Sequence, residues 1–216
     1  AAIIYMANFI MAADAMFNPA AAAAGAAAAR AQVGLPARFA LYLASNKPHK
    51  NLVRLVEAWT RVAASGDGAS LVIAGHQDPR FPEAQDRATA LGIGDKVRFI
   101  GDVPASAMPG LYGACDLFVY PSLYEGFGLT PLEAMACGAP VACSNTSSLP
   151  EVAGEAALQF DPRDPGAIAE ACLRVLGDPA LAGELRARGV ARAAVFTWDE
   201  CARRTVAVYR GMGVGG

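Results

Sequence analysis

From residue 39 onward, short apolar runs alternate with longer amphipathic ones, and this alternation constrains the fold more than any other feature. The short runs are bounded by Gly, Pro, Asp or Asn, which is typical of strands buried on both faces of a parallel sheet. They cover residues 39–44, 70–75, 97–101, 116–121, 139–143 and 156–160. Helical patterns follow at 52–63, 83–91, 105–113, 130–137, 166–176, 178–194 and 198–210. Strict alternation predicts an α/β fold, a doubly wound parallel sheet of about six strands with right-handed crossovers and helices on both faces.

The length allows one such domain. With 216 residues, 54% of them hydrophobic, the chain can bury a substantial core, but two full α/β domains would not fit. We expect residues 37–216 to form the domain and residues 1–36 to be a linker or the remnant of a preceding domain. The Ala-rich stretch at 20–31 is compatible with a helix, a linker or a run of unassigned side chains.

Composition excludes several classes of function. The net charge is −2 and the 18 Lys and Arg are scattered, so we expect no nucleic-acid partner. Five Cys and two His form no ligand spacing and there is no Asp-x-Asp pair, so no metal is predicted. The cysteines are typical of a reduced, cytoplasmic protein.

The opening residues carry no targeting signal that we can identify. No basic segment precedes them, and Asn8 and Asp14 interrupt the apolar run well short of the ~20 residues that a membrane span needs. We therefore expect neither a signal peptide nor an anchor, and at most peripheral association with the inner face of a membrane.

In a doubly wound sheet, ligands bind outside the carboxyl ends of the strands, and two loops there carry unusual chemistry. The first loop, SNKPHKN at 45–51, places Lys47 and Lys50 beside the start of a helix that Asn51 would cap. Two cations and free amides suit an anion. The alternative is a pair of solvated lysines, with Pro48 setting the turn.

The second loop, residues 121–138, contains two glutamates at the ends of a tight turn. Gly126 and Gly128 allow a sharp bend and the close approach of a ligand. Glu133 is the only charged side chain between Gly126 and Pro150. Carboxylates accept hydrogen bonds from vicinal hydroxyls, while lysines and amides take phosphate, and the combination describes a nucleotide sugar. A structural alternative is a capping box, with Thr130, Pro131 and Glu133 at N-cap, N1 and N3.

These residues resemble a known family. EGFGLTPLE, residues 125–133, matches the E-x7-E signature of retaining glycosyltransferases of family 4. LYLASNKPHKNL, VRFIGDVP and the closing FTWDECARRTVAVYR follow in the family's order, so the likeness runs from about residue 34 to 209. The chain is similar to the carboxy-terminal, Rossmann-like domain that binds the nucleotide sugar, one half of a GT-B fold with C-terminal helices appended.

The resemblance implies a role for each matching residue. Glu125 would contact hydroxyls of the transferred sugar, Glu133 the ribose hydroxyls, and Lys50 the leaving phosphate. The base would lie against residues 100–103 through backbone contacts. The diphosphate and base contacts would come from Gly126, Phe127, Gly128, Leu129, Thr130, Ile100, Gly101 and Val103. Members of the family often carry an Arg a few residues before the Lys, where this chain has Ser45 and Asn46, and Lys47 is the expected substitute.

The implied reaction is hexosyl transfer with retention, in which Lys50 and turn amides stabilise the departing diphosphate and Glu125 contacts the sugar. The acceptor glycan and part of the catalytic apparatus would come from an amino-terminal domain, so we expect the chain alone to be inactive. The KPHKN form of the first loop resembles bacterial polysaccharide mannosyl- or rhamnosyltransferases and favours GDP-mannose; no cofactor is expected.

Two alternatives come from other classes. One is a non-catalytic nucleotide-sugar-binding or assembly module. The other is an NAD-dependent enzyme, which would need G-x-G-x-x-G directly after the first strand. That strand is followed by ASNKPHK, and Pro131 stands where the third glycine of the later turn would be, so the sequence disfavours this alternative.

Overall fold

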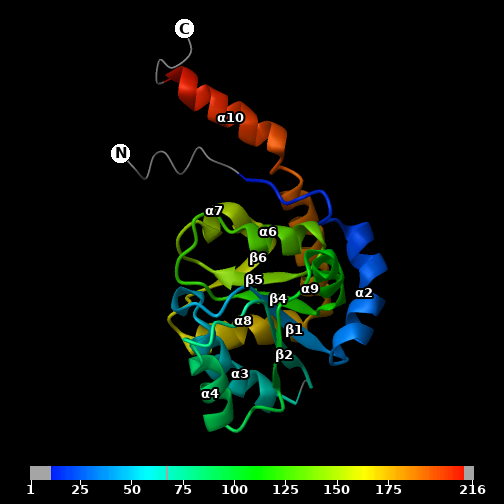
Figure 1. Ribbon diagram of the computed structural model, residues 1–216, viewed down its shortest axis with the longest axis vertical. Coiled ribbons are helices and arrows are strands. Elements are labelled where there is room, and N and C mark those ends of the chain that lie inside the picture. Colours follow the sequence, from blue (N-terminus) through cyan, green and yellow to red (C-terminus); the bar gives the residue numbers. More distant parts are fainter. Residues whose placement is uncertain (1–10, 67, 212–216) are drawn as a thin grey trace.

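The computed structural model describes residues 11–66 and 68–211 and confirms the predicted architecture. Six parallel strands form one sheet in the order β3-β2-β1-β4-β5-β6 (Figure 1). The strands are β1 Phe39–Leu43, β2 Ser70–Ala74, β3 Val97–Gly101, β4 Leu117–Tyr120, β5 Val141–Ser144 and β6 Ala157–Phe160. The chain winds outward from β1 to β3 and then crosses to β4, so the order reverses between β1 and β4. Loops that leave these two strands diverge around a crevice, which is where such sheets bind ligands.

The central strands are apolar because both of their faces are covered. Every residue of β1, β4 and β5 is buried, as expected for parallel strands between two helical layers. The predicted strand at 139–143 begins two residues late, at Val141. Pro140 has no N–H to donate to the ladder, which accounts for the later start.

Helices cover both faces of the sheet (Figure 1). On one face α3 packs against α4 and α8, and on the other α2 packs against α5 and α6 against α9. The helices are α2 Pro19–Val33, α3 Leu52–Ala64, α4 Glu83–Ala90, α5 Met108–Ala114, α6 Leu129–Ala136, α7 Leu149–Ala153, α8 Pro165–Gly177, α9 Pro179–Ala193 and α10 Trp198–Gly211. Single 3-10 turns occur at η1 Pro48–Lys50, η2 Ala105–Ala107 and η3 Gly154–Ala156. The sequence did not predict α7.

The Ala-rich segment is a helix that packs on the domain. The Oδ1 of Asn18 accepts a hydrogen bond from the amide of Ala21 at 2.9 Å and caps the start of α2. The helix lies so close to α5 that a Cβ on Gly110 would be 2.6 Å from the carbonyl oxygen of Gly25. This contact explains a composition without an amphipathic face, because only small side chains permit it. The domain boundary at residue 36 stays a prediction.

The C-terminal helix is less embedded than the other described helices. The last helix, α10, extends away from the body in Figure 1, and none of its residues Trp198–Gly211 is buried. The prediction that the opening run is neither signal peptide nor anchor concerns residues 1–17, and residues 1–10 lie outside the described part. Within residues 11–66 and 68–211, no helix has the length and apolar character needed to cross a membrane.

Candidate functional site

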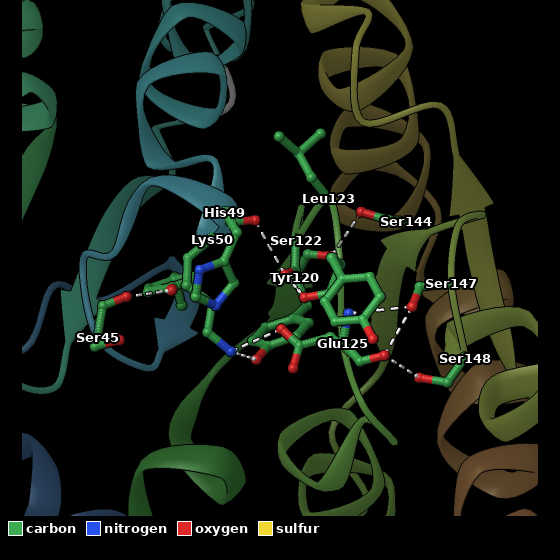
Figure 2. Close-up of polar contacts among 12 residues, drawn as sticks. Ser45, His49, Lys50, Tyr120, Ser122, Leu123, Glu125, Ser144, Ser147 and Ser148 are labelled. Carbon is green, nitrogen blue, oxygen red and sulfur yellow. Dashed lines mark hydrogen bonds and ion pairs between the residues drawn. The ribbon is translucent and has the colours of Figure 1, made fainter. Parts of the chain in front are cut away.

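The loops that follow β1 and β4 lie side by side at the carboxyl edge of the sheet (Figure 2). The amide of Leu123 donates to the carbonyl of His49 at 2.8 Å, and the hydroxyl of Ser122 donates to the same carbonyl at 3.2 Å. These bonds join residues that are more than seventy positions apart in sequence. The two loops are neighbours because β1 and β4 pair directly in the sheet.

Lys50 forms a close ion pair with Glu125. Its Nζ donates to Oε1 of Glu125 at 2.7 Å and to the hydroxyl oxygen of Tyr120 at 2.7 Å (Figure 2). The two charged side chains are only 14% and 13% exposed, so the alternative of a solvated lysine is wrong for Lys50. Lys47 is exposed, which favours that alternative there; its contact with a ligand stays a prediction.

Tyr120 was missed by the sequence analysis, although it lies at the centre of this arrangement. It is the last residue of β4, and its ring stacks between those of Tyr42 and Phe118, each centroid 5.9 Å away. Burial, and next the charge of Glu125, raise the pKa of Tyr120, so its hydroxyl stays protonated and its oxygen can accept from Lys50. The sequence feature that could have indicated Tyr120 is a tyrosine at the carboxyl end of an otherwise apolar strand.

Asn51 anchors the first loop instead of capping α3. It occupies the N-cap position with φ of 63°, and its side chain makes no bond to the α3 amides. Its Nδ2 donates instead to the carbonyls of Pro121 at 3.0 Å and Pro162 at 2.7 Å. The predicted cap is therefore wrong: the side chain joins the loops that follow β1, β4 and β6. Asn46 has a similar role, with its Nδ2 2.9 Å from the carbonyls of Asp78 and Phe81.

The glycine turn is braced from the side of β5. The carbonyl of Glu125 accepts hydrogen bonds from the hydroxyls of Ser147 at 2.7 Å and Ser148 at 3.1 Å (Figure 2). The amide of Glu125 donates back to the Ser147 hydroxyl at 3.2 Å. Both serines lie in the loop between β5 and α7. The backbone that carries Glu125 is therefore fixed on both sides, by His49 and by these serines.

The two glycines of the turn differ in what they do for the fold. Gly128 has φ of 107°, and a Cβ there would lie 2.9 Å from Cδ2 of Leu149, so the turn requires glycine. Gly126 has no positive φ, and a Cβ would meet no heavy atom within 4 Å. The fold thus does not require glycine at 126. The close approach of a ligand to this backbone would explain why glycine is found there.

The amides predicted to hold diphosphate lie at the start of α6. The helix begins at Leu129 with Gly128 as N-cap, and the N–H groups of a first turn have no partner within their own helix. The neighbouring ring of Phe127 packs edge-on against Phe196, 5.9 Å between centroids. The turn is therefore held from the C-terminal side as well, by the segment between α9 and α10.

Glu133 lies inside α6 and does not cap it. Because α6 starts at Leu129, Glu133 is its fifth residue and Thr130 its second, so the capping box is wrong. The Oε2 of Glu133 accepts a hydrogen bond from the hydroxyl of Tyr112 on α5, at 3.2 Å. Burial raises the pKa of Glu133, and the hydrogen bond from Tyr112 opposes that rise. This tyrosine, also missed from sequence, is the partner that Glu133 has in apolar surroundings.

The loop predicted to take the base follows β3 and lies at the same edge. Two strand spacings of about 4.8 Å, roughly 10 Å in all, separate β3 from β1. Gly101 accepts a hydrogen bond from the amide of Gly75 at 2.7 Å, while Ile100 and Val103 pack partly against the core. These residues therefore lie at the carboxyl edge of the sheet, as predicted, but next to β2 and two strands away from the loop that carries Lys50.

Cavity size does not locate this site. Four cavities of about 190 to 470 Å³ lie between other elements, such as α2 with α5 and α8 with α9, and none of the four includes Lys50, Glu125 or Glu133. The candidate site is marked instead by its charged groups, because Lys50 and Glu125 are both largely buried and lie against each other. Among the described residues, no three His, Cys, Asp or Glu side chains are grouped to hold a metal ion.

The chain is similar to known proteins in both sequence and fold. Residues 28–194 match the family model described as Glycosyl transferases group 1. The O-antigen chain mannosyltransferase B of Escherichia coli is 40% identical over 176 residues, which cover 80% of this chain and 45% of that protein.

Among solved structures, sucrose-phosphate synthase of Thermosynechococcus elongatus superposes with a TM-score of 0.74 at 31% identity, over 98% of this chain and 51% of that one. HepE of Anabaena, in complex with UDP and glucose, gives a TM-score of 0.75 at 19% identity, over 91% and 54%. The chain spans about half the length of these relatives, and its fold is that of one half of theirs.

Proposed function

The chain belongs to the glycosyl transferases group 1 family, and from this premise we propose that it is the donor-binding half of a retaining glycosyltransferase. The whole protein would move a hexosyl group from a nucleoside-diphosphate sugar to a glycan or lipid-linked acceptor. The acceptor would be bound by the other half, because the chain covers only 45% of its mannosyltransferase relative.

The ion pair between Lys50 and Glu125 is the observation that carries this proposal. Two charges that are 14% and 13% exposed require partners, and in the structure each is the partner of the other. A nucleotide sugar offers a partner to each of them: phosphate for the ammonium and sugar hydroxyls for the carboxylate. Donor binding would thus exchange one set of contacts for another without leaving a buried charge unpaired.

The other predicted contacts with the donor would come from loops at the same carboxyl edge of the sheet. The first-turn amides of α6 would share the diphosphate with Lys50, and Glu133 would accept from the ribose hydroxyls. The base would reach toward residues 100–103, two strands from β1. When the bond to the sugar breaks, negative charge grows on the diphosphate, and Lys50 and these amides stabilise it in place.

Mannose is the favoured sugar and guanine the favoured base. The E. coli relative is an O-antigen chain mannosyltransferase, and the KPHKN loop is of the type expected for such enzymes. The HepE structure holds UDP and glucose, which supports a nucleoside diphosphate as the leaving group in this fold. We place the protein in the cytoplasm, with peripheral contact to the inner face of the membrane where a lipid-linked acceptor would be reached.

Calorimetric titration of the chain with GDP, UDP, ADP and dTDP tests the proposal. We expect GDP to bind most tightly, and Lys50→Ala to weaken it by about 1 to 3 kcal/mol, the scale of a lost hydrogen bond to a charged group. Lys96→Ala is the matched control, because Lys96 directly precedes β3 and so lies at the opposite edge of the sheet. Negligible binding of all four nucleotides would contradict the proposal.

A further inference from the structure

We propose that Tyr112 is a positioning residue that orients Glu133 toward the ribose of the donor, an inference that rests on the donor-binding function above. The two residues come from neighbouring helices, Tyr112 from α5 and Glu133 from α6. The hydroxyl of Tyr112 donates to Oε2 of Glu133 at 3.2 Å. Each carboxylate oxygen has two lone pairs, so this bond leaves Oε1, and one lone pair of Oε2, for the two hydroxyls of a ribose.

The ring of Tyr112 is held in place on several sides. The side chain is 0% exposed. Its ring meets Phe118 of β4 edge-on, 5.4 Å between centroids, and Phe17 edge-on at 6.1 Å. A buried, packed ring cannot change rotamer without disturbing these contacts. The hydroxyl is therefore a fixed donor, and it selects one orientation of a half-buried carboxylate that would otherwise have several.

Tyr112 also opposes the groups that favour the neutral form of Glu133. Burial raises the pKa of Glu133, and so does the charge of Asp14 in the segment before α2. Tyr120 on β4 and Cys137, which directly follows α6, also interact with Glu133. Of the groups that shift this carboxyl, the hydroxyl of Tyr112 is the one that lowers its pKa. The ionised form accepts from hydroxyls more strongly than the neutral form, because its hydrogen bonds are charge-assisted, so the bond from Tyr112 maintains the form that binds ribose best.

A purely structural role for Tyr112 makes a different prediction. If the hydroxyl only satisfies a buried polar group, its loss should affect stability and leave the choice among ligands unchanged. If it acts through Glu133, its loss should matter only for ligands that carry ribose hydroxyls. The two roles can therefore be separated by removing the hydroxyls from the ligand as well as from the protein.

The experiment uses Tyr112→Phe, which keeps the ring and removes the hydroxyl. The probes are the tightest binder among GDP, UDP and ADP and the 2′,3′-dideoxy form of that nucleotide, titrated by calorimetry into the 216-residue chain. We expect Tyr112→Phe to weaken the ribonucleotide about tenfold, as for one hydrogen bond to a charged group. The dideoxy form should change by less than about twofold. Tyr209→Phe, on exposed α10, is the control for a lost tyrosine hydroxyl.

The dependence of binding on pH gives a second readout. Without Tyr112 the pKa of Glu133 is higher, so the neutral carboxyl persists to higher pH. As pH falls, binding of the ribonucleotide should therefore weaken at a higher pH in Tyr112→Phe than in the wild type, and binding of the dideoxy form should not. Phe17→Leu removes one ring contact of Tyr112 and keeps its hydroxyl. It should also weaken the ribonucleotide more than the dideoxy form, but by less than Tyr112→Phe does. It replaces Tyr112→Phe in the test if that variant does not fold.

Each result decides the proposal. Equal weakening of both nucleotides by Tyr112→Phe would show a structural role and overturn it. Equal affinity of the wild type for both nucleotides would overturn the assignment of Glu133 to ribose, and with it the role of Tyr112, while the donor-binding function would stand. Absence of any nucleotide binding by the wild type would overturn the donor-binding function itself.

Discussion

At the residue scale, the ion pair between Lys50 and Glu125 has two consequences for a ligand. It keeps the ammonium ordered before the diphosphate arrives, which reduces the entropy lost on binding. It also means that an incoming phosphate competes with a carboxylate 2.7 Å from Nζ. The two effects act in opposite directions, and substitution at Glu125 separates them.

Glu125→Gln keeps the shape of the side chain and removes its charge. Because the competing carboxylate is gone, we expect GDP to bind more tightly, by about fivefold or more, since a largely buried pair should exceed the ~1 kcal/mol upper range of exposed ion pairs. GDP-mannose should gain less, since its sugar loses an acceptor that GDP does not use. Calorimetry with both ligands measures the difference. A loss of GDP affinity as large as that in Lys50→Ala would contradict the competition.

The two glycines of the turn give a matched pair of substitutions. Gly128→Ala should destabilise the chain by about 1 to 3 kcal/mol, because φ of 107° is strained for alanine and the Cβ would meet Leu149. Gly126→Ala should change stability by less than about 0.5 kcal/mol, as for a surface substitution away from special features. Urea unfolding measures both. If Gly126→Ala nevertheless lowers nucleotide affinity, a ligand approaches that backbone; equal losses of stability would refute the distinction.

At the element scale, α2 depends on a glycine contact with α5. A Cβ at Gly110 would lie 2.6 Å from the carbonyl oxygen of Gly25, and both atoms belong to backbones that packing holds in place. We expect Gly110→Ala to force the helices apart and to cost about 1 to 3 kcal/mol, as for overpacking. Hydrogen exchange should show lost protection in α2 before the strands.

Gly177→Ala is the control for that substitution, because a Cβ there, at the end of α8, meets nothing within 4 Å. It should leave the exchange of α2 unchanged. Retained protection of α2 in Gly110→Ala would show that the close contact does not hold the helix.

The elements were predictable from sequence, whereas their contacts were not. The alternation of apolar runs predicted all six strands, with ends that are correct or at most two residues off, as at Pro140, where the missing N–H shortens β5. Helix α7 was missed because five residues beginning Leu-Pro are too short to show a period. The capping box failed because Gly128, which can adopt a positive φ, takes the N-cap and moves the start of α6.

In the candidate site too, some residues were predictable from sequence and their partners were not. Lys50 could be chosen from sequence because it follows the first strand beside the start of a helix, and Glu125 and Glu133 because they match the E-x7-E spacing around a glycine turn. Tyr120 and Tyr112, which hold them, could not, since buried tyrosines in apolar runs look like core residues. Their roles arise from contacts across 70 and 21 positions, which a local pattern does not encode. The same limit applies to Asn51. It is a residue type that favours a helix N-cap, but its side chain donates to the carbonyls of Pro121 and Pro162 instead.

At the scale of the whole molecule, the proposed function makes the chain one wall of a reaction site. The superposition on sucrose-phosphate synthase includes 98% of this chain and 51% of that one, and the match to the E. coli mannosyltransferase includes 80% of this chain and 45% of that protein. The charged groups that we assign to the donor lie at one edge of the sheet, at the reversal between β1 and β4. Nothing in this assignment supplies an acceptor hydroxyl or a group to receive its proton, so transfer should need the other half.

We therefore expect the 216-residue chain to bind GDP-mannose without transferring mannose. A longer protein that carries the preceding domain in the same polypeptide should transfer it, with release of GDP and retention at the anomeric carbon, followed by NMR of the product. Lys50→Ala in that protein should lower kcat by about tenfold to a thousandfold, because Lys50 stabilises charge that develops only as the bond breaks. Binding without transfer in the longer protein would favour a non-catalytic nucleotide-sugar module, since the donor site would then be intact and the chemistry absent.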